Sequence, residues 1–196
     1  MQTAYIGMGA NIASKAGSPE ETLAAAAREL EKLGRIGGRS SLYSTEPVGY
    51  ADQPRFVNAV VALETGLAPR MLLEGLLGIE RAFGRDRSAG VQNGPRTLDL
   101  DILLYGDVVV SEAGLEIPHP RLAERAFVLV PLSEIASNVV VPGREGKVRE
   151  LLSSLRGGPP EKNDAVVRIQ SDLWRALPCG DGEPAAARTD ARDSDG

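Results

Sequence analysis

Two aspartates, Asp99 and Asp101, stand two residues apart in a segment that alternates charged and apolar side chains. On a β-strand their side chains would share one face, with Cα atoms about 6.5 to 7 Å apart. Carboxylates this close repel each other unless a partner neutralises them, and Mg²⁺ binds such oxygens while keeping positions open for phosphate. Arg96, just before the pair, is placed to hold an anion beside the metal. The segment therefore predicts a site for metal-bound phosphate.

The aspartate pair also has a simpler interpretation, as charge on the exposed face of an edge strand, where it would oppose aggregation. On the pair alone both interpretations stay open. Arg85, Arg87 and Arg96 precede it within fourteen positions of Asp99. Guanidinium groups together with metal-binding carboxylates are what a phosphate site requires, so these arginines favour the first interpretation.

The strand around the pair has two unlike faces. Period-two alternation assigns Leu98, Leu100, Ile102 and Leu104 to one face and Asp99, Asp101, Leu103 and Tyr105 to the other. The first face belongs to a core. The second is charged at its start and apolar at its end, so we expect a polar pocket near Asp99 and packed structure over Tyr105.

The rest of the chain supplies elements that can position this strand. Ser18, Pro19 and Glu21 form a helix-start signal, and Gly34 and Gly84 mark the ends of two helices. The patterns predict strands at 3–10, 38–43, 56–65 and 98–105, helices at 19–33 and 69–83, and then a hairpin at 108–117, a helix near 125–135 that Pro131 would kink or break, and a helix at 147–155. This order predicts an α+β fold of the ferredoxin-like βαββαβ type. We expect an antiparallel sheet with helices on one face, the other face free for a site, and extra C-terminal helices.

Composition limits the classes of function. The chain has 196 residues, a net charge of −5 and one cysteine. The acidic balance argues against general nucleic-acid binding, and one cysteine cannot form an intramolecular disulfide or a zinc cluster. No apolar run approaches a membrane span or a secretory signal, so we expect a cytoplasmic monomer without membrane contact. We divide the chain into a domain at 1–156 and a largely disordered extension at 157–196, with one short amphipathic piece at 166–177.

Four motifs in order resemble one enzyme family. They are the segments 5–11 (Tyr-Ile-Gly-Met-Gly-Ala-Asn), 45–48 with 52–59 (Thr-Glu-Pro-Val and Asp-Gln-Pro-Arg-Phe-Val-Asn-Ala), 94–106 (Gly-Pro-Arg-Thr-Leu-Asp-Leu-Asp-Ile-Leu-Leu-Tyr-Gly) and 117–132, which begins Ile-Pro-His-Pro-Arg. Over about residues 3 to 156 the chain resembles the 6-hydroxymethyl-7,8-dihydropterin pyrophosphokinases of folate biosynthesis. The resemblance implies transfer of pyrophosphate from ATP to the hydroxymethyl group of the pterin, with release of AMP.

The resemblance also implies roles for individual residues. Asp99 and Asp101 would bind two Mg²⁺ ions that bridge the ATP triphosphate. The catalytic residues would be Arg85, Arg96, Asp99 and Asp101, the ATP-binding residues Glu80, Arg85, Arg96, His119 and Arg125, and the pterin-binding residues Thr45, Val48, Phe56, Asn58 and Phe127. From composition alone Asn58 reads as a core amide, so the resemblance changes its expected role to that of a ligand-binding residue.

Two other functions fit the same fold class. A two-metal nucleotidyltransferase also uses paired aspartates on such a sheet, but the net charge offers no basic template surface. A non-enzymatic ligand-binding regulatory module would not need aspartates and arginines in one place. The chain also departs from the family pattern: the 85–94 segment is one residue longer than expected, it has no lysine, and Asn93 stands where a tryptophan often precedes Gly-Pro-Arg. Because of these departures, we expect loop closure over the nucleotide to differ here.

Overall fold

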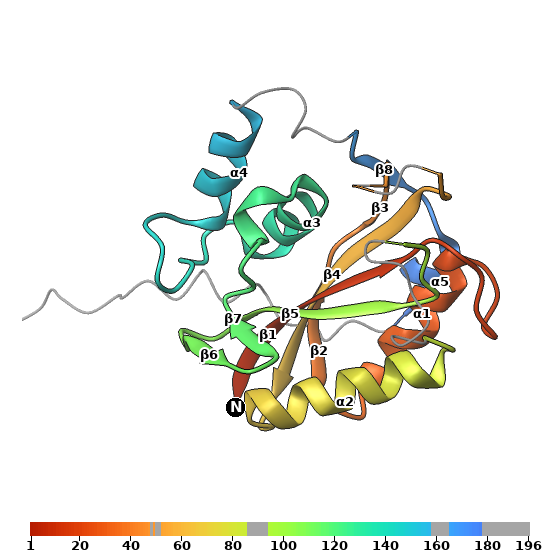
Figure 1. The fold of residues 1–196 in the computed structure, drawn as a ribbon, viewed down its shortest axis with the longest axis horizontal. Coiled ribbons are helices and arrows are strands. Elements are labelled where there is room, and N and C mark those ends of the chain that lie inside the picture. The colour runs from red at the N-terminus through yellow and green to blue at the C-terminus, as the bar shows by residue number, and fades with distance from the viewer. Residues whose placement is uncertain (48, 50–51, 86–93, 158–164, 178–196) are drawn as a thin grey trace, which may run out of the picture.

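The computed structural model describes residues 1–47, 49, 52–85, 94–157 and 165–177 (Figure 1). A short 3-10 turn, Leu122–Glu124, precedes the third helix. The other elements are β1 (Gln2–Ala10), α1 (Pro19–Leu30), β2 (Arg35–Arg39), β3 (Leu42–Thr45), β4 (Phe56–Thr65), α2 (Pro69–Ala82), β5 (Asp99–Tyr105), β6 (Val110–Glu112), β7 (Leu115–Ile117), α3 (Ala126–Ala136), α4 (Val148–Arg156), β8 (Val167–Ile169) and α5 (Asp172–Arg175). The predicted α+β class and antiparallel sheet are confirmed.

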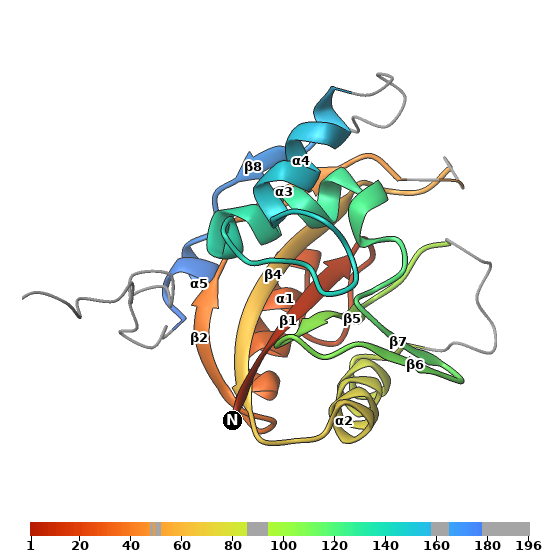
Figure 2. The same cartoon turned by 90° about the vertical axis from the view of Figure 1, so that its left-hand side faces the viewer.

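The main sheet has the order β5-β1-β4-β3-β8, with β2 also paired to β4, and every pairing within it is antiparallel. One face packs on α1 and α2 in a core that includes Ile6, Leu63 and Leu100. The second face packs on α3 and α4 in another core that includes Leu104 and Leu129. Figure 2 shows α1 and the pair α3 and α4 on opposite sides of β4. The second face is therefore partly covered, not wholly free as the sequence suggested.

The predicted single strand at 38–43 is wrong, because two strands lie along the same side of β4. β2 pairs with Val61–Glu64 and β3 with Phe56–Asn58. Between them the backbone of Ser40 donates to the carbonyl of Val60 at 2.9 Å, and its hydroxyl accepts the amide of Val60 at 2.9 Å. A serine side chain thus replaces one bond of the regular ladder, which a period-two pattern cannot reveal.

A bulge interrupts β5 after the aspartates. Tyr5 pairs with Leu104 and Ile6 with Ile102, which leaves Leu103 as the extra residue. Leu103 and Leu104 both join the core under α3, and Tyr105 turns to the opposite core, where its hydroxyl donates to the carbonyl of Leu67 at 2.6 Å. The predicted faces are therefore correct through Leu103 and wrong for Leu104 and Tyr105.

The helices follow their predicted signals with small differences at their ends. Ser18 and Glu21 form the expected capping box of α1, whose helix ends at Leu30 and not at Leu33. α3 runs through Pro131 without a break, and the kink expected as the other outcome stays a prediction. Because proline has no amide hydrogen, Pro131 leaves the carbonyl of Phe127, four residues earlier, without its helical partner.

The described part of the C-terminal stretch is folded onto the sheet. β8 pairs with β3, and Trp174 and Leu177 are buried in the core beside α1. The expected single amphipathic piece at 166–177 is therefore a strand followed by a helix. The division of the chain at residue 156 stays a prediction. Within the described residues, no helix is long and apolar enough to cross a membrane.

Candidate active site

A cavity opens on the second face of the sheet, beside the first turn of α3. It holds about 810 Å³ of empty space, part of which is open to solvent. Its lining includes Gly7, Gly9, Thr45, Glu46, Phe56, Asn58, Val60, Arg96, Asp99, Asp101, Leu103, Arg121, Arg125 and Phe127. Polar and aromatic groups from β3, β4, β5 and the start of α3 thus meet around the glycines of β1.

Strand register explains why these residues meet. Gly9 of β1 lies opposite Asp99 on one side and Asn58 on the other, and Gly7 lies between Asp101 and Val60. Neighbouring strands are about 4.8 Å apart, so the aspartates and the β4 side chains stand about 10 Å apart across a row of glycines. A Cβ at Gly9 would come within 3.1 Å of Asn58 Oδ1, and one at Gly7 within 3.2 Å of Leu103. Because the two glycines have no side chains, the space between the β5 aspartates and the β4 side chains stays open.

Asp99 is held by two arginines. Its Oδ2 lies 2.6 Å from Arg96 Nη1, and its Oδ1 lies 3.1 Å from Arg85 Nη2. All three side chains are at most 20% exposed, so these pairs are less weakened by solvent than surface ion pairs are. Asp101, on the same face of β5, is half-buried. The structure thus brings together the four residues predicted to be catalytic: Arg85, Arg96, Asp99 and Asp101.

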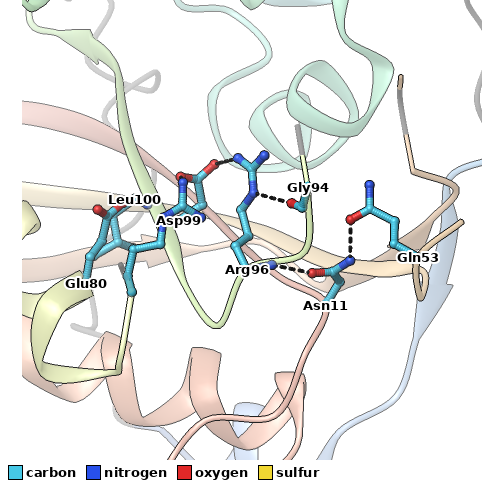
Figure 3. A network of polar contacts seen from close by, with 8 residues as sticks. Asn11, Gln53, Glu80, Gly94, Arg96, Asp99 and Leu100 are labelled. Atoms are coloured by element: carbon cyan, nitrogen blue, oxygen red, sulfur yellow. Dashed lines mark hydrogen bonds and ion pairs between the residues drawn. The ribbon is translucent and has the colours of Figure 1, made fainter. Parts of the chain in front are cut away.

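The segment that carries Arg96 is fixed to β1 by a buried asparagine, as Figure 3 shows. Asn11 Oδ1 accepts the Arg96 amide at 2.7 Å, and the Asn11 amide hydrogen is donated to the Arg96 carbonyl at 3.1 Å. The Asn11 Nδ2 group donates to Gln53 Oε1 at 2.9 Å and to the carbonyl of Pro54 at 3.0 Å. One side chain therefore joins the arginine to the segment leading into β4. Sequence reasoning quoted Asn11 only as part of a motif.

Glu80 lies behind the strand and does not line the cavity. It is 1% exposed, and its Oε1 accepts the Leu100 amide at 2.9 Å (Figure 3). Leu100 separates Asp99 from Asp101, so this bond fixes the strand between the two carboxylates. The predicted contact of Glu80 with ATP stays untested, and the described geometry gives it a supporting role.

The other half of the cavity has an amide and two aromatic rings. Asn58 is 7% exposed and donates from Nδ2 to Thr45 Oγ1 at 2.8 Å, which leaves its Oδ1 toward Gly9. The Arg96 guanidinium lies 5.6 Å from the centre of the Phe56 ring, and that of Arg125 lies 5.5 Å from the Phe127 ring. A flat heterocycle with polar edges would fit such a lining.

His119 stands beside the cavity rather than in its lining. Its amide donates to the Leu103 carbonyl at 2.9 Å, and its Nδ1 accepts the Arg121 amide at 3.1 Å. Burial lowers the pKa of His119 to about 4, with further lowering by the charges of Arg125 and Arg121. Burial and Arg121 also lower the pKa of Arg125, while Asp101 and Asp99 oppose that shift. The histidine is therefore neutral near pH 7.

Most of the residues predicted from sequence line the cavity or touch a lining residue. Val48 and Arg87 lie outside the described residues, and Glu80 and His119 support the site from outside the lining. Sequence reasoning missed Arg121 and Glu46 as lining residues. The signal for Arg121 was present in the Pro-His-Pro-Arg motif, whereas Glu46 lies in a connection whose path the sequence does not reveal.

Comparison with known proteins identifies relatives over most of the chain. Residues 5–137 match the family model of 7,8-dihydro-6-hydroxymethylpterin-pyrophosphokinase. The chain is 44% identical over 144 residues to the 2-amino-4-hydroxy-6-hydroxymethyldihydropteridine pyrophosphokinase of Pseudomonas aeruginosa, a match covering 72% of this chain and 85% of that one. It is 45% identical over 157 residues to the enzyme of the same name from Methylorubrum extorquens, covering 79% of this chain and 94% of that one.

Solved structures show the same fold. One is the Plasmodium falciparum HPPK-DHPS wild type with pterin and p-hydroxybenzoate, with a TM-score of 0.63 and 16% identity. That match covers 83% of this chain and 43% of the other. At this identity the likeness concerns the fold alone.

Proposed function

Because the chain belongs to the 7,8-dihydro-6-hydroxymethylpterin-pyrophosphokinase family, we propose that its cavity binds ATP over β5 and the pterin over β3 and β4. Family membership makes the chain an ATP-using pyrophosphokinase of folate biosynthesis, which excludes the non-enzymatic alternative. The observation that carries the proposed layout is the strand register, in which Gly9 separates Asp99 from Asn58.

The donor set at the β5 end fits magnesium. Asp99 and Asp101 offer carboxylate oxygens on one face of the strand, and no group of three potential ligand residues occurs within the described part of the chain. Mg²⁺ in nucleotide sites is held by one or two carboxylates together with water and substrate phosphates, so two aspartates suffice. We infer that Asp99 and Asp101 hold two Mg²⁺ ions. When bound, these ions neutralise phosphate charge and polarise phosphoryl oxygens.

Arginines supply the remaining charge at the phosphates. Arg85 and Arg96 form ion pairs with Asp99, and a triphosphate offers oxygens of the same charge to both guanidinium groups. Arg121 and Arg125 line the cavity beside them. We infer that Arg85 and Arg96 bind phosphate oxygens of ATP. His119 completes the group as a neutral hydrogen-bond donor from Nε2, because Nδ1 accepts the Arg121 amide.

Aromatic and amide groups position the pterin. Phe127 stacks on the ring face, opposite Phe56, while Asn58 and Thr45 bind its polar edge. We retain Val48 in this pocket as a prediction from sequence. Such contacts fix the hydroxymethyl oxygen in line with the β-phosphorus, and positioning of this kind is the main protein contribution to phosphoryl-type transfer.

The reaction requires no covalent enzyme intermediate. The hydroxymethyl oxygen attacks the β-phosphorus, the bond to the α-phosphate oxygen breaks, and AMP leaves. Asp101 is our candidate to accept the hydroxyl proton, since His119 has a low pKa and its Nδ1 is occupied. The monomeric state and the cytoplasmic location stay predictions.

An assay of AMP release tests this layout. We expect the wild-type chain to form AMP from ATP and Mg²⁺ only when hydroxymethyl-dihydropterin is present. Asp99→Asn should lower kcat by at least about 100-fold, because it removes a carboxylate proposed to hold the magnesium that neutralises the phosphates. Asp107→Asn, on the exposed turn after β5, is the matched control and should retain full activity. Absence of AMP with the wild type, or full activity in Asp99→Asn, would contradict the proposal.

A further inference from the structure

Residues 165–177, here called the strap, pack on the domain although the match to the family model ends at residue 137. β8 pairs with β3 through Val167 opposite Ser44 and Ile169 opposite Leu42. β3 therefore lies between β4 and β8, and without the strap it would be an edge strand. Figure 1 shows β8 beside β3 and α5 near α1, so the strap passes around this edge of the sheet.

Trp174 anchors the far end of the strap. Its side chain is 4% exposed, and its Nε1 donates to the Ser40 carbonyl at 2.8 Å. The Arg39 guanidinium lies 5.4 Å from the ring centre and donates to the Leu177 carbonyl at 3.1 Å. Ser40 in turn binds the amide of Val60, which lines the cavity. The anchor is therefore one residue away from the cavity wall.

Arg55 connects the near end of the strap to the same wall. Its Nη2 donates to the Ala165 carbonyl at 3.3 Å, and its Nε donates to Ser44 Oγ at 2.9 Å. It also forms an ion pair with Glu46, a lining residue. Its chain neighbour Phe56 lines the cavity as well. A single guanidinium thus joins the strap, the end of β3 and the start of β4.

We propose that the strap, held in place by Arg55 and Trp174, positions the pterin half of the cavity. Arg55 and Trp174 are therefore positioning residues for the pterin. The inference rests on the proposed layout of the two substrates. Thr45 and Asn58 must keep their 2.8 Å bond in a geometry that accepts the ring, and Thr45 ends the strand that β8 covers. A β3 that is paired on both sides loses less freedom when the ligand binds. The ATP half lies on β5, at the opposite edge of the sheet from β8.

Separate Michaelis constants for the two substrates test this proposal. In Arg55→Ala, and in a chain that stops after residue 157, we expect the KM for hydroxymethyl-dihydropterin to rise about tenfold, which corresponds to one or two lost hydrogen bonds. The KM for ATP should stay within about twofold in both, because the β5 contacts are untouched. Two controls should match the wild type: Arg175→Ala, which removes an exposed side chain of α5, and a chain that stops after residue 178.

Two further measurements separate this proposal from the proposed function. Trp174 is the sole tryptophan of the chain, so its emission reports whether the strap is docked without any turnover. Calorimetric binding of the pterin, with a non-hydrolysable ATP analogue present, should show the same tenfold loss of affinity in Arg55→Ala.

If the wild type forms no AMP, the proposed function fails while this binding comparison still decides the role of the strap. If the shortened chain does not fold, Arg55→Ala decides alone. An unchanged pterin KM and affinity, or an equal rise of both KM values with a lower melting temperature, would overturn the positioning role.

Discussion

Asp99 shows how the two like charges on β5 are balanced by neighbouring arginines. Arg96 and Arg85 lie 2.6 and 3.1 Å from its two oxygens. These partners neutralise the carboxylate that Asp101 would otherwise repel from the same face of β5. A nucleotide with its cations supplies both signs of charge at once, so every group can exchange partners without being left unpaired. The proposed role of Asp99 therefore depends on its having oppositely charged partners.

Asp101 allows a test of chemistry apart from folding. It is half-buried at the cavity and lies beside a glycine, Gly7, so its replacement creates no hole in either core. We expect Asp101→Ala to lower kcat by at least about 100-fold and to leave the far-UV circular dichroism spectrum unchanged. Asp101→Asn should lose as much activity, because the amide keeps the shape and loses the charge. A melted spectrum would make this aspartate structural instead.

The lowered pKa of His119 predicts a pH dependence that can be followed at a single side chain. It is the sole histidine, so a proton NMR titration of its ring should show a single midpoint near pH 4, below the ordinary 6.5. The unfolded chain would bind this proton near pH 6.5 and the folded chain only near 4. The stability from the neutral ring is thus complete above pH 6.5 and is lost as the pH falls toward 4.

Substitution of this histidine supplies the control for the pH dependence of the unfolding free energy. In His119→Asn, the unfolding free energy should fall less between pH 6.5 and 4 than in the wild type. Because Arg121 and Arg125 lie beside the ring, the comparison holds only at matched ionic strength. A ring midpoint at or above 6.5 would contradict the burial argument.

At the scale of single residues, the sequence predicted which side chains meet better than it predicted which way each one faces. Asp99, Asp101 and Arg96 follow from residue type and period-two spacing, because both are local properties. Glu80 was expected at the nucleotide, yet its carboxylate faces the Leu100 backbone. Whether a buried glutamate faces the ligand or the backbone behind it depends on how a helix packs on a strand, which local spacing does not contain.

The link between α2 and β5 is the element-scale support of the aspartates. Glu80→Ala would leave the buried Leu100 amide without its acceptor, so we expect a loss of about 1–3 kcal/mol in unfolding free energy by urea denaturation. Glu80→Gln keeps an oxygen acceptor and should lose less. Glu74→Ala, at an exposed position of the same helix, should cost under about 0.5 kcal/mol. If Glu80→Gln keeps its stability and raises the KM for ATP, Glu80 contacts the nucleotide as the family resemblance implies.

Elements were predictable where one signal dominated. The capping box at Ser18 and the apolar run at 56–65 gave their helix and strand because caps and alternation act locally. The break at Ser40 and the bulge at Leu103 were not predicted, because each depends on the partner strand. The break depends on an amide of β4, and the bulge depends on a register shift against β1. The bulge also turns Leu104 beneath α3, which keeps the apolar end of β5 covered.

At the scale of the whole molecule, one sheet serves two cores. β4 gives Val61 to the core on α1 and α2, and gives Val60 to the core on α3 and α4. The strap adds Trp174 and Leu177 to the first core from far along the chain. The sequence hinted at this stretch only as an amphipathic piece, because its burial requires an edge strand already in place. If either core unfolds, the sheet that the other core packs against loses the cover on one of its faces.

This shared sheet predicts that the domain unfolds as one unit. Leu129 of α3 is fully buried in the second core, whereas Trp174 reports on the first. Leu129→Ala should cost about 3 kcal/mol, the usual price of such a cavity. The urea midpoint followed by Trp174 emission should then fall by the same amount as that followed by circular dichroism. Val140→Ala, at a side chain 57% exposed, is the control and should move neither midpoint. If Leu129→Ala lowers the circular dichroism midpoint while the Trp174 midpoint stays fixed, the two cores unfold separately, and the sheet does not couple the strap to the helices above the cavity.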